Sequence, residues 1–169
     1  MRLPHCVFLA LAVSCSVPAQ TYNISTFAGG ALPVNIPGTS AFLRNARAVA
    51  VDRAGNVFIA TENVVLRLDA TTGILSLMAG DGTIGFSGDN GPATSAQLSL
   101  GAAGVSGLAL DSDGNLYIAD SPNQRVRKVS GGVITTVAGG GFTSGDNGPA
   151  TSAQLRAPIG VAVDSASNL

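Results

Sequence analysis

Few residues of this chain have the types and spacing that catalysis requires. The only histidine, His5, and the only two cysteines, Cys6 and Cys15, lie within the first fifteen residues. Imidazole and thiolate groups supply most nucleophiles, general bases and zinc ligands at neutral pH. A mature chain that begins after them has neither group. We therefore expect no Ser-His-Asp or Cys-His site and no zinc or haem site in it.

Several aspartates are candidates for a cation or ligand site. Asp111 and Asp113 lie in an Asp-Ser-Asp-Gly-Asn segment with the spacing of part of a calcium loop. The equivalent segments that begin at Asp52 and Asp164 lack the second carboxylate, so we interpret all three as tight hairpin turns. Asp89 and Asp146 lie in two identical blocks, and for these a ligand or calcium role stays open beside a structural turn.

Two glycine-rich loops have the spacing of phosphate-binding motifs. Residues 80–85 match G-x-G-x-x-G, and residues 140–145 have the glycine spacing of a P-loop. A dinucleotide site needs its loop to open a helix, but residues 86–92 read Phe-Ser-Gly-Asp-Asn-Gly-Pro. Asp146 stands where a P-loop requires lysine. We interpret both as ordinary loops and predict no cofactor.

Basic residues gather in one predicted strand, at Arg125, Arg127 and Lys128. Alternation places Arg125 and Arg127 on one face and Val126 and Lys128 on the other. We interpret the arginine face as solvated, and the alternative is a patch that recognises anionic groups. The whole chain has 9 basic and 10 acidic residues. Because no basic stripe exists to neutralise phosphates, nucleic-acid binding is not expected.

The first nineteen residues have the order of a signal peptide. Arg2 supplies a positive start, residues 7–13 an apolar middle, and residues 17–19 a small-residue cleavage site. We predict removal of residues 1–19 and a secreted, periplasmic or cell-envelope protein. The alternatives are a buried core segment and a lipoprotein that keeps Cys15. No apolar run reaches the ~18–20 residues of a membrane span.

The rest of the chain is an internal repeat. Residues 88–98 recur identically at residues 145–155, and residues 50–60 match residues 109–119. A third copy of that second block begins at Val161. The period of 50–60 residues is typical of propeller blades.

Each repeat unit reads as four short strands joined by turns. In the second unit these strands are predicted at residues 107–110, 115–119, 125–129 and 133–138. The fold class is therefore all-β, a partial β-propeller of four-stranded antiparallel blades. Ala50–Asp52 and Leu108–Asp111 are predicted to be inner strands with apolar side chains buried between blades. Proline favours the first position of a helix, so we expect one helical turn after Pro92 and after Pro149.

Three recurring blocks resemble the NHL repeat. They are Gly114–Asp120, Asn123–Arg127 and Ile134–Gly140. The connecting Gly-Asp-Asn-Gly-Pro-Ala-Thr-Ser-Ala-Gln-Leu block resembles the linkers of secreted bacterial and teneurin-type NHL repeats. The resemblance implies a β-propeller, usually of six blades, that serves mainly as a platform for binding. Six blades would need roughly 330 residues, so we expect an N-terminal fragment with two full blades.

The repeat suggests a division of the chain. We expect a signal peptide at 1–19, an N-terminal outer (closure) strand with its loop at 20–47, one repeat at 48–106, a second at 107–159, and a truncated third at 160–169. The closure strand is expected at Ile24–Gly29.

The function expected from this organisation is a non-catalytic, extracytoplasmic scaffold that binds a protein or carbohydrate. One alternative is an enzyme of the lactonase or lyase type, with a calcium site in further blades. The other is the sensor domain of a membrane-tethered protein. We nominate no catalytic residue, cofactor-binding residue or metal ligand, and the ligand-binding residues are unknown.

Overall fold

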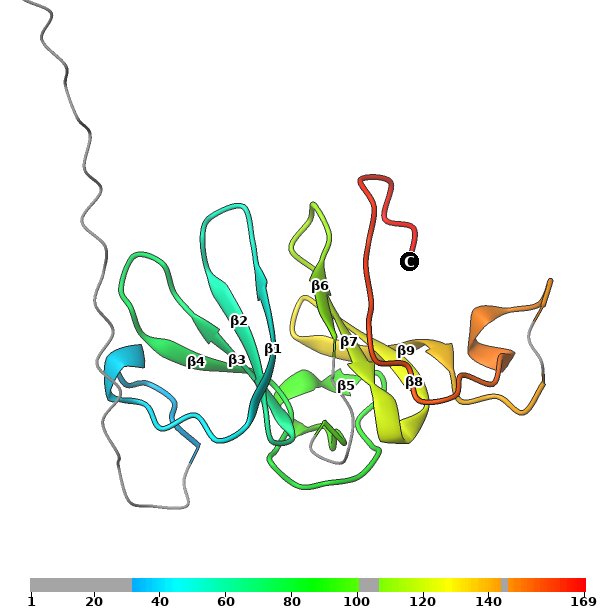
Figure 1. Ribbon diagram of the computed structural model, residues 1–169, viewed down its shortest axis with the longest axis horizontal. Coiled ribbons are helices and arrows are strands. Elements are labelled where there is room, and N and C mark those ends of the chain that lie inside the picture. Colours follow the sequence, from blue (N-terminus) through cyan, green and yellow to red (C-terminus); the bar gives the residue numbers. More distant parts are fainter. Residues whose placement is uncertain (1–31, 101–106, 144–145) are drawn as a thin grey trace, which may run out of the picture.

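The computed structural model describes residues 32–100, 107–143 and 146–169, which contain two antiparallel sheets (Figure 1). The first sheet consists of β1 (Ala46–Val51), β2 (Val57–Thr61), β3 (Val64–Leu68) and β4 (Leu75–Ala79). The second consists of β5 (Gly91–Pro92), β6 (Leu108–Leu110), β7 (Leu116–Asp120), β8 (Arg125–Ser130) and β9 (Val133–Gly139).

Both sheets have the topology of a propeller blade. The strand order is β1-β2-β3-β4 in the first and β5-β9-β8-β7-β6 in the second, so four consecutive strands pair in sequence order in each. The two-residue β5 adds to the outer edge of the second sheet. Within the described ranges the only helices are short 3-10 turns. The predicted all-β fold and the four strands of the second unit are confirmed.

An aspartate side chain stabilises the turn between β1 and β2 and the equivalent turn between β6 and β7. Asp111 Oδ1 accepts hydrogen bonds from the backbone amides of Asp113 (3.0 Å) and Asn115 (2.9 Å), and its Oδ2 accepts one from Asn115 Nδ2 (2.7 Å). Asp52 and Asp164 repeat this pattern with the asparagine four positions further on. The interpretation of these segments as turns is confirmed, because one carboxylate and one asparagine are sufficient to close each of them.

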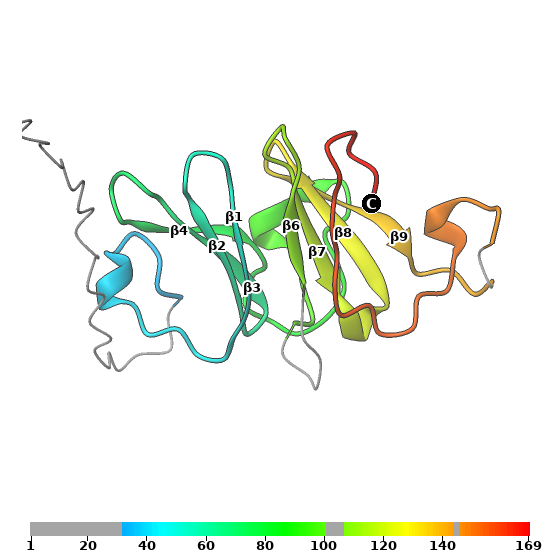
Figure 2. The ribbon, with the colours of Figure 1, turned by 45° about the horizontal axis from the view of Figure 1, so that its top comes forward.

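The two sheets lie side by side (Figure 2), and the largest apolar cluster lies between them. Phe58 and Val65 come to it from the first sheet, Leu108 and Ile118 from the second, and Leu98 from the segment that connects them. A second cluster joins the first sheet to residues 32–43, and a third joins the second sheet to Leu155, Val161 and Val163. Each sheet therefore packs against other segments on both of its faces.

The prediction for the inner strands is confirmed for β6 and wrong in part for β1. Leu108 is 9% exposed, and Ala48 and Ala50 pack against the cluster between the sheets. Val49 and Val51, by contrast, are 65% and 60% exposed. Successive strand residues point to opposite faces, so these two valines lie on the face of β1 directed away from the second sheet.

The helical turns expected after the two prolines are present as 3-10 turns. They are η2 (Ala93–Ser95) and η4 (Ala150–Ser152), and Pro92 and Pro149 precede them as N-caps in extended conformation. Proline was expected as the first helical residue. It lies one position earlier, where its fixed φ near −59° suits the extended residue that leads into the turn.

A third copy of the linker, which the sequence comparison missed, precedes the first sheet. Residues 35–41 read Asn-Ile-Pro-Gly-Thr-Ser-Ala and contain η1 (Gly38–Ser40) after Pro37. Asn35 has a positive φ of 59°, as do Asn90 (64°) and Asn147 (62°) in the two other copies. Part of the segment expected to be an N-terminal loop is therefore a linker. The predicted signal peptide and the strand expected at 24–29 lie outside the described residues.

Candidate functional site

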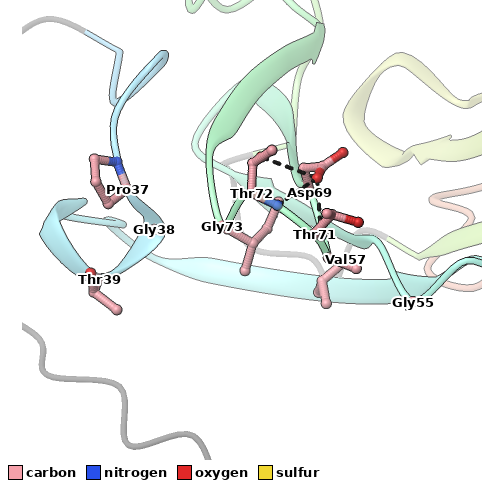
Figure 3. Close-up of a pocket in the computed structure, with 11 residues that line it drawn as sticks. Pro37, Gly38, Thr39, Gly55, Val57, Asp69, Thr71, Thr72 and Gly73 are labelled. Atoms are coloured by element: carbon pink, nitrogen blue, oxygen red, sulfur yellow. Dashed lines mark hydrogen bonds between the residues drawn. The ribbon is translucent and has the colours of Figure 1, made fainter.

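A hollow of about 490 Å³ lies at one end of the first sheet (Figure 3). Pro37, Gly38 and Thr39 of the N-terminal linker form one wall, and residues 69–73, in the turn between β3 and β4, form the other. Gly55, Val57 and Leu68 complete the lining.

Asp69 shapes the turn that forms one wall of the hollow. Its Oδ1 accepts hydrogen bonds from the amides of Thr71 (3.0 Å) and Thr72 (2.9 Å) and from Thr72 Oγ1 (3.1 Å), while Arg67 donates to Oδ2 (2.9 Å). The hydrogen bond from the Thr72 amide is the main cause that lowers the pKa of Asp69 below its ordinary value, followed by the bond from the Thr72 hydroxyl. Asp69 is therefore an ionised structural acceptor and is unsuited to act as a general base near neutral pH.

The hollow belongs to the first sheet because of two local features. The chain runs from Asp69 to Ile74 between β3 and β4, whereas Gly131 and Gly132 alone join β8 to β9. Gly38 also approaches the sheet closely, since a Cβ there would lie 2.6 Å from a methyl carbon of Leu68. The longer turn and the linker that contains Gly38 thus line the hollow from two sides.

The lining of the hollow can bind a ligand through hydroxyl groups and apolar surface. Thr39 and Thr71 are exposed, and the hydrogen bonds within the turn use the Thr71 amide rather than its hydroxyl. Pro37, Val57 and Leu68 offer carbon surface beside them. The one carboxylate present is already saturated with donors. Over the described part of the chain, no group of three or more His, Cys, Asp or Glu side chains could hold a metal ion.

A second polar feature is the buried guanidinium of Arg127, which is 0% exposed. Arg127 Nη2 lies 2.8 Å from Asp89 Oδ1 and 3.0 Å from the Ser87 carbonyl oxygen, and Nη1 lies 3.4 Å from Asp120 Oδ2. Arg125 stacks on the ring of Phe86, with its guanidinium carbon 3.9 Å from the ring centroid.

The interpretation of this arginine face as solvated is wrong. The predicted alternation is correct, because Val126 packs in the cluster on the far face, where Lys128 lies 5.2 Å from the Tyr117 ring. The linker covers the other face, however, and that excludes water from Arg127. Alternation defines which residues share a face but says nothing about what covers it.

Asp120 is a buried acidic residue that sequence reasoning did not single out. Its carboxylate accepts hydrogen bonds from the Ser99 amide (2.9 Å) and from Asn123 Nδ2 (2.9 Å) besides Arg127. Burial raises the pKa of Asp120 above its ordinary value, against the opposing effect of these hydrogen bonds and of the Arg127 charge. The only signal in the sequence was an acidic residue at the end of an otherwise apolar strand.

The two aspartates of the identical blocks have different surroundings. Asp89 accepts from Arg127 and from Thr136 Oγ1 (2.7 Å), so it joins the linker to the second sheet. Asp146 is exposed and makes no ion pair with any residue that the structure describes. A ligand or calcium role for either stays open beside a structural one.

Comparison with known proteins identifies the repeat that contains this buried arginine. Residues 103–129, which include β6, β7 and most of β8, match the NHL repeat family. The chain contains an NHL repeat at these residues. The resemblance read from the sequence is thereby confirmed. Part of the chain is also similar to mouse teneurin-1 (32% identity) and human teneurin-1 (31%). Each alignment covers 66% of this chain and 5% of teneurin-1.

Solved structures resemble this chain in fold. A structural genomics protein of unknown function from Bacteroides thetaiotaomicron has a TM-score of 0.53 at 25% identity, over 65% of this chain and 28% of that one. Auxiliary nutrient binding proteins from Bacteroides thetaiotaomicron and Bacteroides ovatus have TM-scores of 0.51 and 0.53 at 19% identity, over 70% of this chain and 32% of theirs. No helix in the described ranges is long and apolar enough to cross a membrane.

Proposed function

We propose that this protein is a non-catalytic, extracytoplasmic scaffold that binds its ligand in the hollow between η1 and the β3–β4 turn. The non-catalytic part of the proposal rests on the hydrogen bonds that the acidic side chains accept. The turn aspartates Asp52, Asp111 and Asp164 are each saturated by the asparagine and amides of their own turn. Such carboxylates serve the fold and are not free for acid–base chemistry.

The ligand class follows from the lining of the hollow. Exposed threonine hydroxyls next to proline, valine and leucine carbons suit a neutral ligand that has both hydroxyl groups and apolar faces, as a carbohydrate has. The likeness in fold to proteins named as auxiliary nutrient binding proteins supports a ligand-binding role. A partner protein that presents such a group is the second kind of ligand.

The cellular location and the division of the chain are part of the proposal. Residues 1–19 serve as a signal peptide, and the mature protein acts in the periplasm, at the cell envelope or outside the cell. The repeat units are 48–106, 107–159 and 160–169. The segment 20–47 combines an outer strand with the linker copy at residues 35–41.

A pair of matched substitutions tests the binding site. Thr39 and Thr94 are equivalent, exposed positions in η1 and η2, but Thr39 alone lines the hollow. Thr39→Trp fills the hollow, and Thr94→Trp adds the same ring elsewhere. A glycan array identifies a ligand, and calorimetry with that ligand is expected to show at least a tenfold loss of affinity for Thr39→Trp and none for Thr94→Trp.

Two results would contradict the proposal. Equal affinities of both variants would show that the hollow is not the binding site. Calcium-dependent turnover of a lactone or other ester, abolished by a chelator, would show an enzyme instead.

A further inference from the structure

The side-chain amide of Asn56 connects two turns of the first sheet. Its Nδ2 donates to Asp52 Oδ2 (2.7 Å), which closes the turn between β1 and β2. Its Oδ1 accepts a hydrogen bond from the backbone amide of Ala70 (2.9 Å), which lies in the turn between β3 and β4. Asn56 is 7% exposed, so without the Ala70 amide its oxygen would be buried and unsatisfied. One buried side chain therefore holds the two turns together.

This connection determines where one wall of the hollow lies. Ala70, Thr71 and Thr72 line the hollow, and Gly55 of the β1–β2 turn lines it on the same side (Figure 3). A Cβ on Gly55 would lie 3.5 Å from the Cβ of Ala70, which is ordinary van der Waals contact. The two turns are thus in close contact where Asn56 joins them.

A different hydrogen bond connects the β3–β4 turn to the opposite wall. The backbone amide of Gly38, in the N-terminal linker, donates to the carbonyl oxygen of Gly73 (2.8 Å). The second unit has the equivalent bond, from the Ala93 amide to the carbonyl oxygen of Gly132 (2.8 Å). The contact between linker and turn is therefore common to both units and does not explain why the hollow belongs to the first.

The second unit offers a matched comparison for Asn56. The two sheets have the same register, since Arg127 in β8 pairs with Ile118 as Leu66 in β3 pairs with Ile59. The asparagine of each Asp-x-x-x-Asn turn lies three positions before that isoleucine. The two asparagines therefore occupy equivalent positions in equivalent turns.

Within the described residues, only the asparagine of the first unit reaches a neighbouring turn. Asn115 closes its own turn with the same distances as Asn56, 2.9 Å from its amide to Asp111 Oδ1 and 2.7 Å from Nδ2 to Asp111 Oδ2. A Cβ on Gly114 would meet nothing within 4 Å, unlike one on Gly55. The β8–β9 turn consists of two glycines, so it is too short to cover Asn115.

We propose that Asn56 is a positioning residue of the ligand site, whose amide oxygen holds the β3–β4 turn where Thr71 can bind a carbohydrate together with Thr39. The inference rests on the binding role proposed for the hollow. Thr71 is exposed, and the turn uses its amide rather than its hydroxyl. Asn56 itself is not among the residues that line the hollow. It acts through the turn, because a wall that is ordered before binding lowers the entropic cost of association.

Hydrogen exchange, followed by NMR on the full-length chain, tests the positioning without any ligand. The Ala70 amide lies in an exposed turn, yet it should exchange at least about tenfold more slowly than an unstructured amide. Asn56→Ala is expected to remove this protection and to speed exchange of the Thr72 and Gly73 amides about three- to tenfold, the effect of one lost hydrogen bond. Asn115→Ala removes the same bonds from the turn of the second unit and is expected to leave these amides unchanged.

Stability measurements separate positioning from a purely structural role. Because the two asparagines close equivalent turns, Asn56→Ala and Asn115→Ala should lower the urea midpoint by similar amounts. Equal exchange of the β3–β4 turn in the two variants would overturn the proposal. An Ala70 amide that exchanges in the wild type as fast as an unstructured amide would overturn it too, and that measurement needs no variant.

An array of neutral oligosaccharides, probed with the labelled proteins, tests the consequence for binding. Asn56→Ala should need about three- to tenfold more protein than the wild type for half-maximal signal, and Asn115→Ala the same amount as the wild type. If Asn56→Ala binds like the wild type while Thr39→Trp does not, the positioning role is wrong and the binding role stands. If Thr39→Trp also binds like the wild type, the proposed function fails, and Asn56 positions no ligand site.

Discussion

Replacing Arg127 alone with leucine is expected to lower the free energy of unfolding far more than replacing Asp89, Asp120 and Arg127 together. Arg127→Leu alone leaves the Asp120 carboxylate buried at 0% exposure without its cation. The first unit shows an apolar solution at the same positions, with Val34 and Leu66 packed together and with Thr61 ending β2 as Asp120 ends β7. The matched variant therefore combines Asp89→Val, Asp120→Thr and Arg127→Leu.

The structure allows the two effects to be estimated. Removing one partner of a buried ion pair costs about 3–5 kcal/mol, whereas exchange of a complete buried network for packed apolar residues ranges from neutral to about 1–4 kcal/mol stabilising. For a chain of 169 residues, 1 kcal/mol shifts the melting temperature by about 2–4 °C. The single variant should therefore melt roughly 6–20 °C lower than the wild type, and the triple variant between the wild-type temperature and roughly 16 °C above it.

Circular dichroism near 218 nm, followed during heating and during urea unfolding, measures both variants. The urea slope should stay constant if only stability has changed. A triple variant as unstable as the single one would refute the reasoning, because the buried charge would then not be the cause. A single variant that loses less than about 1 kcal/mol would refute it too, since that is below the cost of an unpaired buried ion.

Further predictions concern pH, packing, backbone strain and metals. Hydrogen bonds from the Asn56 side chain and amide hold the pKa of Asp52 below its ordinary 3.8. The stability that ionised Asp52 provides is therefore present above pH 3.8 and is lost as the pH falls through the folded pKa. In the Asp52→Asn variant, the urea midpoint should fall less between pH 5 and pH 3 than in the wild type. Leu98→Ala, at a position with 0% exposure, should cost about 2–5 kcal/mol in urea unfolding, and Leu155→Ala, in the second copy of the block, should cost less because Leu155 is only half-buried. Gly80→Ala should destabilise more than Gly73→Ala, because φ is positive at both but a Cβ at Gly80 would lie 2.2 Å from a backbone oxygen while one at Gly73 meets nothing within 4 Å; thermal melting compares the two. The chain without its predicted signal peptide should retain no stoichiometric zinc after dialysis, as measured by elemental analysis, because it has no His or Cys.

Most of the strands could be predicted from the sequence because their signals are local. Apolar runs between turns rich in Asp, Asn and Gly placed the strands of the second unit within one or two residues of β6, β7, β8 and β9. The recurring Asp-x-x-x-Asn pattern of the turns closes on itself, so it could be read without knowing any distant contact. The linker copy at residues 35–41 could not be recognised from its sequence, because Asn-Ile-Pro replaces the Asn-Gly-Pro of the other two copies.

The sequence by itself thus determined the repeat, the blade topology and which side chains share a strand face. Only the tertiary structure decided what lies against each face. Arg127 is buried because Ser87 and Asp89, about forty positions earlier in the chain, fold over it. The hollow lies between the N-terminal linker, where Gly38 packs close to Leu68, and the β3–β4 turn, which is longer than the β8–β9 turn of the second sheet. Burial depends on contacts between segments far apart in sequence, and a local pattern contains no information about them.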